Sequence, residues 1–117
     1  MIALAAFVLA AEPEPLSLEP FMDEEVAAHA FEVQVTCLGT EAFNRRNDTR
    51  DSKAVAADVV SACSANEATL RSALADVYRR KPSLVQGGQT ADEAAADYVS
   101  QMDSRMVSVI EEGREHK

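Results

Sequence analysis

Apolar residues recur at helical spacing through nearly all of this 117-residue chain, and this periodicity limits its fold more than any other feature. Between residues 23 and 47 the apolar positions follow one another at intervals of three and four, which places them on one face of a helix. Acidic residues at 23–25 and the pair Arg45-Arg46 suit the two ends of its dipole. The stripe consists of Ala27, Ala30, Phe31, Val35, Cys37, Leu38 and Ala42, with Gln34 beside Val35. We expect a first helix over about 23–47.

A second helical pattern follows a group of turn-forming residues at 47–50. Its apolar positions are Val55, Ala56, Val59, Val60, Cys63, Leu70, Ala73 and Val77. The segment Ser64-Ala65-Asn66-Glu67 has the form of a capping box, which would start a new helix there. The apolar register nevertheless continues through this segment without a change of phase. We therefore expect one helix over about 52–80, ended by Pro82, and keep a break or shallow kink near Ser64 as the alternative.

The third helical pattern begins after a loop that contains Gly87-Gly88. Thr90-Ala91-Asp92-Glu93 is a second capping box, and the pattern ends near Gly113. Its apolar positions are Ala95, Tyr98, Val99, Met102, Met106, Val109 and Ile110. Three helices, at about 23–47, 52–80 and 91–112, predict an all-α, up-down-up three-helix bundle over residues 22–113 with a frayed tail at 114–117.

The two cysteines are placed symmetrically about the first predicted turn. Cys37 lies thirteen residues before Arg50 and Cys63 thirteen residues after it, and both belong to apolar stripes. In an antiparallel hairpin they would lie at the same height and face each other. We expect a disulfide that staples the first hairpin, which would contribute about 3.5 kcal/mol by closing a loop of this length. Two buried free thiols are the alternative for a protein of the cytosol.

The N-terminal residues suggest export. The apolar run from Ile2 to Ala11 would span only about 15 Å as a helix, too short to cross a bilayer. Its length and small residues are typical of a signal peptide, here residues 1–10 with cleavage after Ala10, although no Lys or Arg precedes the run. An N-terminal helix packed on a cytosolic domain is the alternative. Residues 11–21, rich in Pro and Glu, would form a spacer, and we expect a periplasmic or secreted protein.

The charge pattern excludes some partners. With a net charge of −9 the chain lacks the basic surface that nucleic acids or anionic lipids require. In the antiparallel hairpin, the basic run 79–81 should meet the acidic residues 23–25. Arg45, Arg46, Arg50 and Lys53 would gather at the opposite end, without aromatic residues on which bases could stack. We expect no nucleic acid partner and no integral membrane span in the mature chain.

Candidates for chemistry are few. Glu25, His29 and Glu32 share one helical face and could offer two or three metal ligands, but a solvated polar face explains them better. Met102 and Met106 could bind Cu(I) as thioethers, although their place in an apolar stripe predicts core packing. No nucleophile motif or phosphate-binding loop is present, so we expect no catalytic residues and no cofactor.

The pattern Cys37-Leu38 followed by Ala56, Val59 and Ala62-Cys63 resembles small exported bacterial helical proteins of uncharacterised function. The resemblance covers about residues 23–80 and implies the compartment and the hairpin, but no activity. We expect a non-enzymatic interaction or structural module of the bacterial envelope, whose partner is another protein or an envelope component. The alternative is a small-molecule or metal carrier that uses a bundle interior lined by Phe31, Tyr98, Met102 and Met106.

Overall fold

The structure, a computed structural model, describes residues 21 and 23–115, and this part of the chain is helical without any strand. Its elements are α2 (Glu25–Asn44), α3 (Ser52–Ala62), α4 (Ser64–Arg80), the short 3-10 helix η2 (Pro82–Leu84) and α5 (Ala91–Glu115). The all-α prediction is confirmed. The predicted signal peptide and most of the predicted spacer lie outside the described residues.

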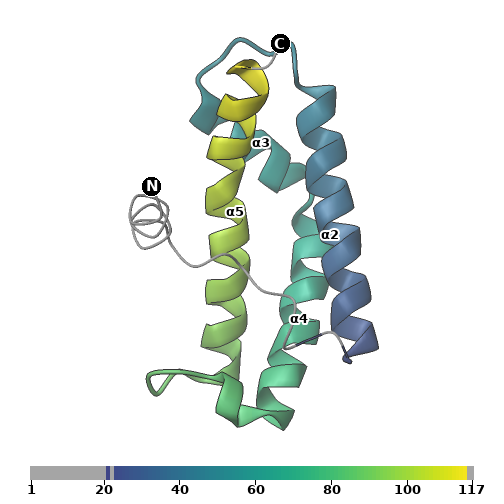
Figure 1. The fold of residues 1–117 in the computed structure, drawn as a ribbon, viewed down its shortest axis with the longest axis vertical. Helices are drawn as coiled ribbons and strands as arrows, with labels where there is room; N and C mark the ends of the chain where they lie inside the picture. The colour runs from purple at the N-terminus through teal and green to yellow at the C-terminus, as the bar shows by residue number, and fades with distance from the viewer. Residues whose placement is uncertain (1–20, 22, 116–117) are drawn as a thin grey trace, which may run out of the picture.

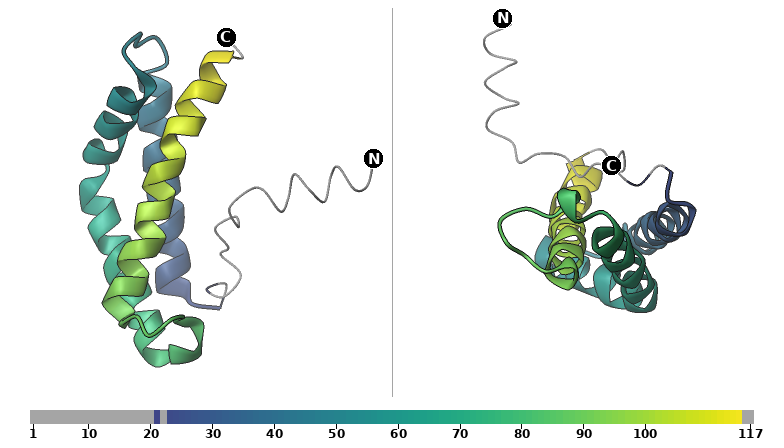
Figure 2. Two further views of the ribbon diagram at one scale, coloured as in Figure 1. Left: turned by 90° about the vertical axis from the view of Figure 1, so that its left-hand side faces the viewer. Right: turned by 90° about the horizontal axis from the view of Figure 1, so that it is seen from below.

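The helices form an elongated bundle in which the chain runs along α2, returns through α3 and α4, and runs back along α5 (Figure 1). α4 packs against both α2 and α5, while α3 packs mainly against α5. Figure 2 shows the same arrangement from the side and from below. The turn between α2 and α3 therefore lies at the same end of the bundle as the end of α5, and the η2 loop lies at the other.

The prediction of three helices is wrong, because the expected helix over 52–80 is divided into α3 and α4 at Cys63. At this residue the backbone N–H bonds to the carbonyl of Val60, three residues earlier, so the regular ladder is interrupted for one step. The apolar face nevertheless keeps its phase: Ala56, Val59, Cys63, Leu70 and Val77 are all buried. Phase continuity correctly indicated a continuous buried face, but one non-helical residue was enough to separate two helices without changing that face.

The buried face of α2 also differs from the expected one. Gln34 is only 1% exposed, whereas Val35 is 45% exposed. The buried face of α2, which packs against α4 and α3, runs through Ala27, Ala30, Gln34 and Leu38. Residue 34 lies on this line at the 3.6-residue period, while residue 35 is turned away by a further 100°. Packing on two neighbours decides which of the two adjacent residues is enclosed, and here the polar one is.

The two ends of α5 are well defined. The Thr90–Glu93 capping box is confirmed: the Glu93 N–H donates to Thr90 Oγ1 at 3.1 Å, and the Thr90 N–H donates to Glu93 Oε1 at 2.8 Å. At the other end α5 continues through Gly113 to Glu115, so residues 114 and 115, expected in a frayed tail, are helical.

An aromatic group closes the lower end of the core. Phe21 is 2% exposed, and its ring makes edge-to-face contacts with Tyr78 and Tyr98 at centroid distances of 5.7 and 5.8 Å. Phe21, the last residue of the predicted spacer, therefore belongs to the core of the domain.

Candidate functional site

A disulfide joins Cys37 of α2 to Cys63 at the junction of α3 and α4, as the symmetric spacing predicted. The Cα atoms are 6.0 Å apart, and Cys63 is fully buried. The bond therefore joins α2 to the single non-helical residue between α3 and α4. Neither cysteine is free, which is compatible with a compartment outside the cytoplasm.

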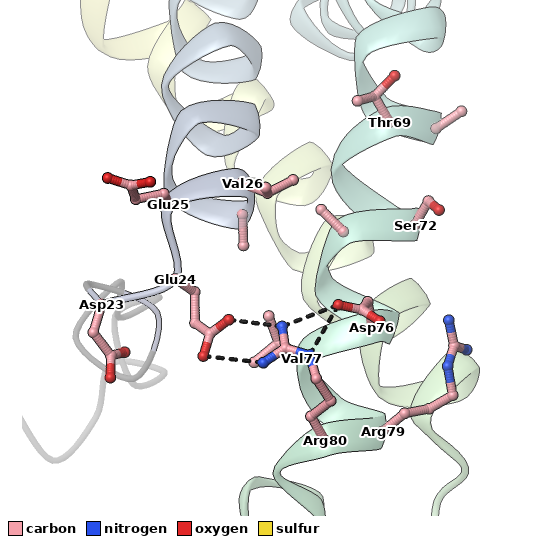
Figure 3. Close-up of a pocket in the computed structure, with 13 residues that line it drawn as sticks. Asp23, Glu24, Glu25, Val26, Thr69, Ser72, Asp76, Val77, Arg79 and Arg80 are labelled. Carbon is pink, nitrogen blue, oxygen red and sulfur yellow. Dashed lines mark hydrogen bonds and ion pairs between the residues drawn. The ribbon is translucent and has the colours of Figure 1, made fainter.

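The basic run at the end of α4 meets the acidic start of α2, as predicted. Glu24 binds Arg80 at 2.7 Å and Lys81 at 3.0 Å, and Figure 3 shows the Arg80 guanidinium between Glu24 and Asp76. Hydrogen bonds from Arg80 and then Lys81 lower the pKa of Glu24 to about 2. Arg79 turns instead to Asp92 of α5, at 3.2 Å. These cations are used within the fold, which leaves them less suited to bind a partner.

A long groove lies between α2 and α4 above this ion pair. One hollow of about 1,140 Å³ lies between the start of α2 and the last turns of α4, and the residues that line it appear in Figure 3. It shares Glu25, Val26 and Thr69 with a second hollow of about 410 Å³ further along α2. We call the two hollows together the outer groove. The lining of the second hollow is completed by His29, Ala30, Val33 and Asn66.

The helix α2 carries most of the exposed large apolar side chains in the described part of the chain. Four of the five belong to it: Val26, Val33, Val35 and Phe43, with Val109 of α5 as the fifth. Val26 is 76% exposed and Val33 is 38% exposed, and both line the outer groove. A helix that is apolar on several sides is usually covered on several sides. Among residues 21 and 23–115, the buried side chains of α2 lie on one side of the helix only.

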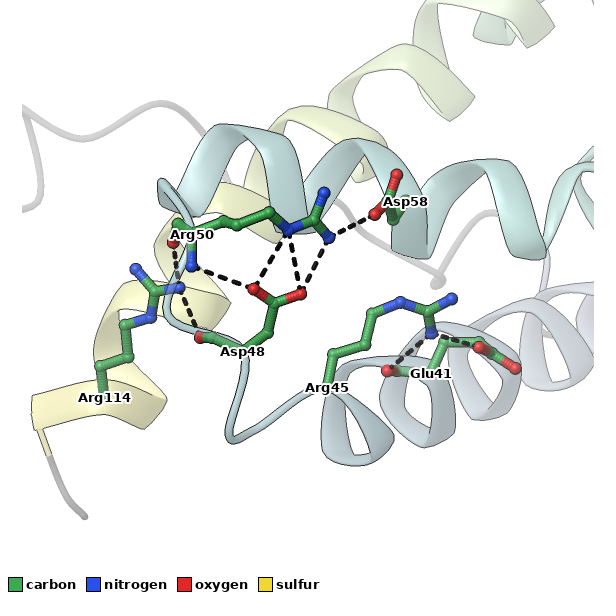
Figure 4. A network of polar contacts seen from close by, with 6 residues as sticks. All are labelled: Glu41, Arg45, Asp48, Arg50, Asp58 and Arg114. Carbon is green, nitrogen blue, oxygen red and sulfur yellow. Dashed lines mark hydrogen bonds and ion pairs between the residues drawn. The ribbon is translucent and has the colours of Figure 1, made fainter.

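A polar network holds the turn between α2 and α3 against the end of α5 (Figure 4). Arg50 binds Asp48 at 2.8 Å and also binds Asp58, and Arg114 donates to the backbone oxygens of Asp48 and Arg50. Hydrogen bonds from Arg50 lower the pKa of Asp48 to about 2. Arg45 is bound to Glu41 one turn earlier in α2. The predicted basic cluster at this end is therefore largely neutralised by neighbouring carboxylates and carbonyls.

Sequence reasoning did not find the carboxyl pair of Glu67 and Asp103, at the contact of α4 and α5. Glu67 Oε1 and Asp103 Oδ1 are both buried without a conventional hydrogen-bond partner, and the second oxygen of Glu67 accepts from Arg71 at 2.8 Å. Burial, followed by the hydrogen bond and charge of Glu67, raises the pKa of Asp103 to about 7. Asp103 therefore keeps its proton up to near neutrality. The sequence places Glu67 in a capping-box pattern, and only the register of α4 against α5 brings it beside Asp103.

The candidate metal ligands Glu25, His29 and Glu32 lie exposed along α2. Within residues 21 and 23–115, no three His, Cys, Asp or Glu side chains come together in a way that could hold a metal ion. Met102, Met106 and Tyr98 are at most 8% exposed and belong to the hydrophobic core, with Phe31 packed against it.

Comparisons with protein-family models, with curated proteins and with solved structures found no match to this chain. In the described part of the chain, none of the helices combines the length and the apolar character that crossing a bilayer demands.

Proposed function

We propose that this protein is an exported, non-enzymatic interaction module of the bacterial envelope that binds a helix of another protein along its outer groove. The concentration of exposed apolar side chains on α2 carries this proposal. Val26 and Val33 are seven residues apart, two turns of one helix, which is the spacing at which a docked helix presents its own apolar anchors. The disulfide supports export, because such bonds persist mainly in oxidising compartments.

The charges around the groove favour a basic partner helix. Glu25 and Glu32 are exposed beside Val26 and Val33, and the whole chain has a net charge of −9. The two arginines at the end of the groove are already bound to carboxylates, Arg80 to Glu24 and Asp76 and Arg79 to Asp92. A partner whose apolar face is flanked by Lys or Arg would therefore match the groove, whereas an acidic helix would be repelled.

The alternative function, a carrier that uses the bundle interior, has less support. Met102 and Met106 are only 6% and 5% exposed and are packed among other core side chains. Native mass spectrometry of protein purified from its own host distinguishes the two functions. A retained small molecule or metal would favour the carrier, and a stoichiometric complex with a protein would favour the interaction module.

Binding of a model helix tests the groove directly. The probe is a labelled amphipathic peptide of about 18 residues with Leu on one face and Lys on the other, measured by fluorescence anisotropy. Val26→Ser combined with Val33→Ser should weaken its binding roughly thirtyfold, since each buried valine contributes about 1 kcal/mol. The matched control is Val35→Ser with Val109→Ser, which removes two exposed valines that lie outside the groove.

The same assay includes a peptide in which every Lys is replaced by Glu, which should not bind. Equal binding of the Lys peptide to both double variants would contradict the proposed groove. Equal binding of the Lys and Glu peptides would contradict the proposed basic partner.

A further inference from the structure

A second, smaller pocket lies at the other end of α2, between its last turn and the last turns of α5. Its volume is about 300 Å³, at the lower end of the range for small-molecule sites. Ala42, Phe43, Val109 and Ile110 provide its apolar walls. Phe43 is 62% exposed and Val109 is 49% exposed, so two of these walls still face solvent. We call this hollow the end pocket.

The polar part of the end pocket is entirely cationic. Its remaining lining residues are Gly113 and three arginines, Arg45, Arg46 and Arg114, and no acidic side chain lines it. This is unusual in a chain with 20 acidic and 11 basic residues. The lining is therefore rich in arginine although the whole chain is acidic, and one of the three arginines, Arg45, is paired with Glu41 outside the lining.

Internal bonds hold the three guanidinium groups at the pocket without using all of their donors. Arg46 lies over the Phe43 ring at 4.1 Å from its centroid and donates one hydrogen bond to the Phe43 carbonyl. Arg114 donates through one nitrogen to the turn between α2 and α3, and Arg45 through one nitrogen to Glu41. A guanidinium has five N–H donors, so each arginine retains donors for a further acceptor.

We propose that the end pocket binds a small apolar carboxylate, with its hydrocarbon part against Phe43, Val109 and Ile110 and its carboxylate on the arginines. The apolar walls would be removed from water by the hydrocarbon, and the planar carboxylate is the group that a guanidinium binds best. The site is separate from the outer groove and does not depend on the proposed protein partner.

Gly113 provides a way to fill the pocket without disturbing the fold. A Cβ atom at residue 113 would meet no atom within 4 Å, so the space beside it is open. Gly39 is a matched position, because it is also helical and exposed with the same open space, but it does not line the end pocket. Gly113→Leu should therefore block the site, while Gly39→Leu makes the same chemical change elsewhere.

The test titrates the full, oxidised chain with three probes that share a ten-carbon tail: decanoate, 1-decanol and decyltrimethylammonium. Binding is followed by chemical-shift changes in NMR, below the concentration at which the probes form micelles. Decanoate should bind most tightly and the cation least. Gly113→Leu and Arg46→Gln should each weaken decanoate binding at least tenfold, whereas Gly39→Leu and Arg71→Gln, a surface arginine of α4, should leave it unchanged.

Three results would overturn the proposal. One is the absence of decanoate binding to a chain whose NMR spectrum shows it folded. Another is equal binding of the three probes, which would mean that the arginines do not select charge. The third is decanoate binding that Gly113→Leu leaves unchanged, which would place the ligand outside the end pocket.

Discussion

At the scale of single residues, the least expected features are polar groups enclosed by the helices. Gln34 is buried in the centre of the α2 face, and neither atom of its amide finds a hydrogen-bond partner among the described residues. The carboxyl groups of Glu67 and Asp103 are brought together between α4 and α5. Enclosing such groups lowers stability unless they are paired or neutralised. Two predictions follow from this cost.

Replacing Gln34 with Leu should stabilise the protein by about 1–2 kcal/mol, because the unpaired amide is exchanged for an apolar side chain of similar size. The free energy of unfolding is measured in urea. Gln101→Leu is the control, since Gln101 is exposed on α5 and donates a hydrogen bond to Asp97. A loss of stability in Gln34→Leu would contradict the arrangement described for the core.

The protein should become less stable between pH 5 and pH 8. Folding raises the pKa of Asp103 from its usual 3.8 to about 7, so the folded chain keeps a proton that the unfolded chain has lost. The stabilisation is complete below pH 4 and disappears as the pH rises through 7. We expect a loss of about 1–2 kcal/mol, less than the full linkage value because the pair is partly exposed.

Thermal unfolding of wild type and Asp103→Asn at pH 5 and pH 8 measures this effect. The amide cannot lose a proton, so the variant should show little change over that interval. The carboxylates of Glu24 and Asp48, with pKa values of about 2, change stability only at lower pH and do not interfere. If the variant keeps the wild-type pH dependence, another group is responsible.

At the scale of helices, two segments with the same capping-box pattern behave differently. Thr90 and Glu93 form both bonds of the box at the start of α5. α4 starts at Ser64 with Cys63 at its N-cap position and no side-chain cap bond, and Glu67 turns to Arg71 and Asp103. The Thr90 motif follows a loop and caps α5. The Ser64 motif follows α3 directly, with only Cys63 between the two helices, and it does not cap α4.

Thr90→Ala should therefore lower the free energy of unfolding by about 1 kcal/mol, while Ser64→Ala should change it by less than about 0.5 kcal/mol. The pair of variants makes the same type of change in the same sequence pattern. Chemical denaturation with far-UV circular dichroism measures both. Equal effects of the two substitutions would show that Ser64 caps α4 after all.

Periodicity was enough to predict an all-helical fold, and the cysteine spacing was enough to predict the disulfide. Periodicity could not decide between Gln34 and Val35, because adjacent residues differ by 100° and the centre of the buried face depends on which neighbours pack against α2. It also missed the break at Cys63, which leaves the phase unchanged. The sequence does contain one signal for the outer groove, because Val26 and Val33 lie outside the expected apolar stripe. Their exposure could not be predicted, since it depends on how far α4 covers α2.

At the scale of the whole molecule, the account depends on the disulfide and the compartment it requires. The bond closes a loop of 26 residues, and its removal should cost about 3.5 kcal/mol, a large share of the stability of a small domain. A chain in a reducing compartment would lack this contribution. The interaction module that we propose is therefore more stable where the bond can form and persist.

The intact mass of protein isolated from its native source, measured with and without reductant after thiol alkylation, tests this claim most directly. We expect a chain that has lost residues 1–10, takes up no alkylating reagent before reduction, and takes up two equivalents afterwards. A chain that still begins with Met1 and is alkylated at both cysteines without reductant would contradict this claim.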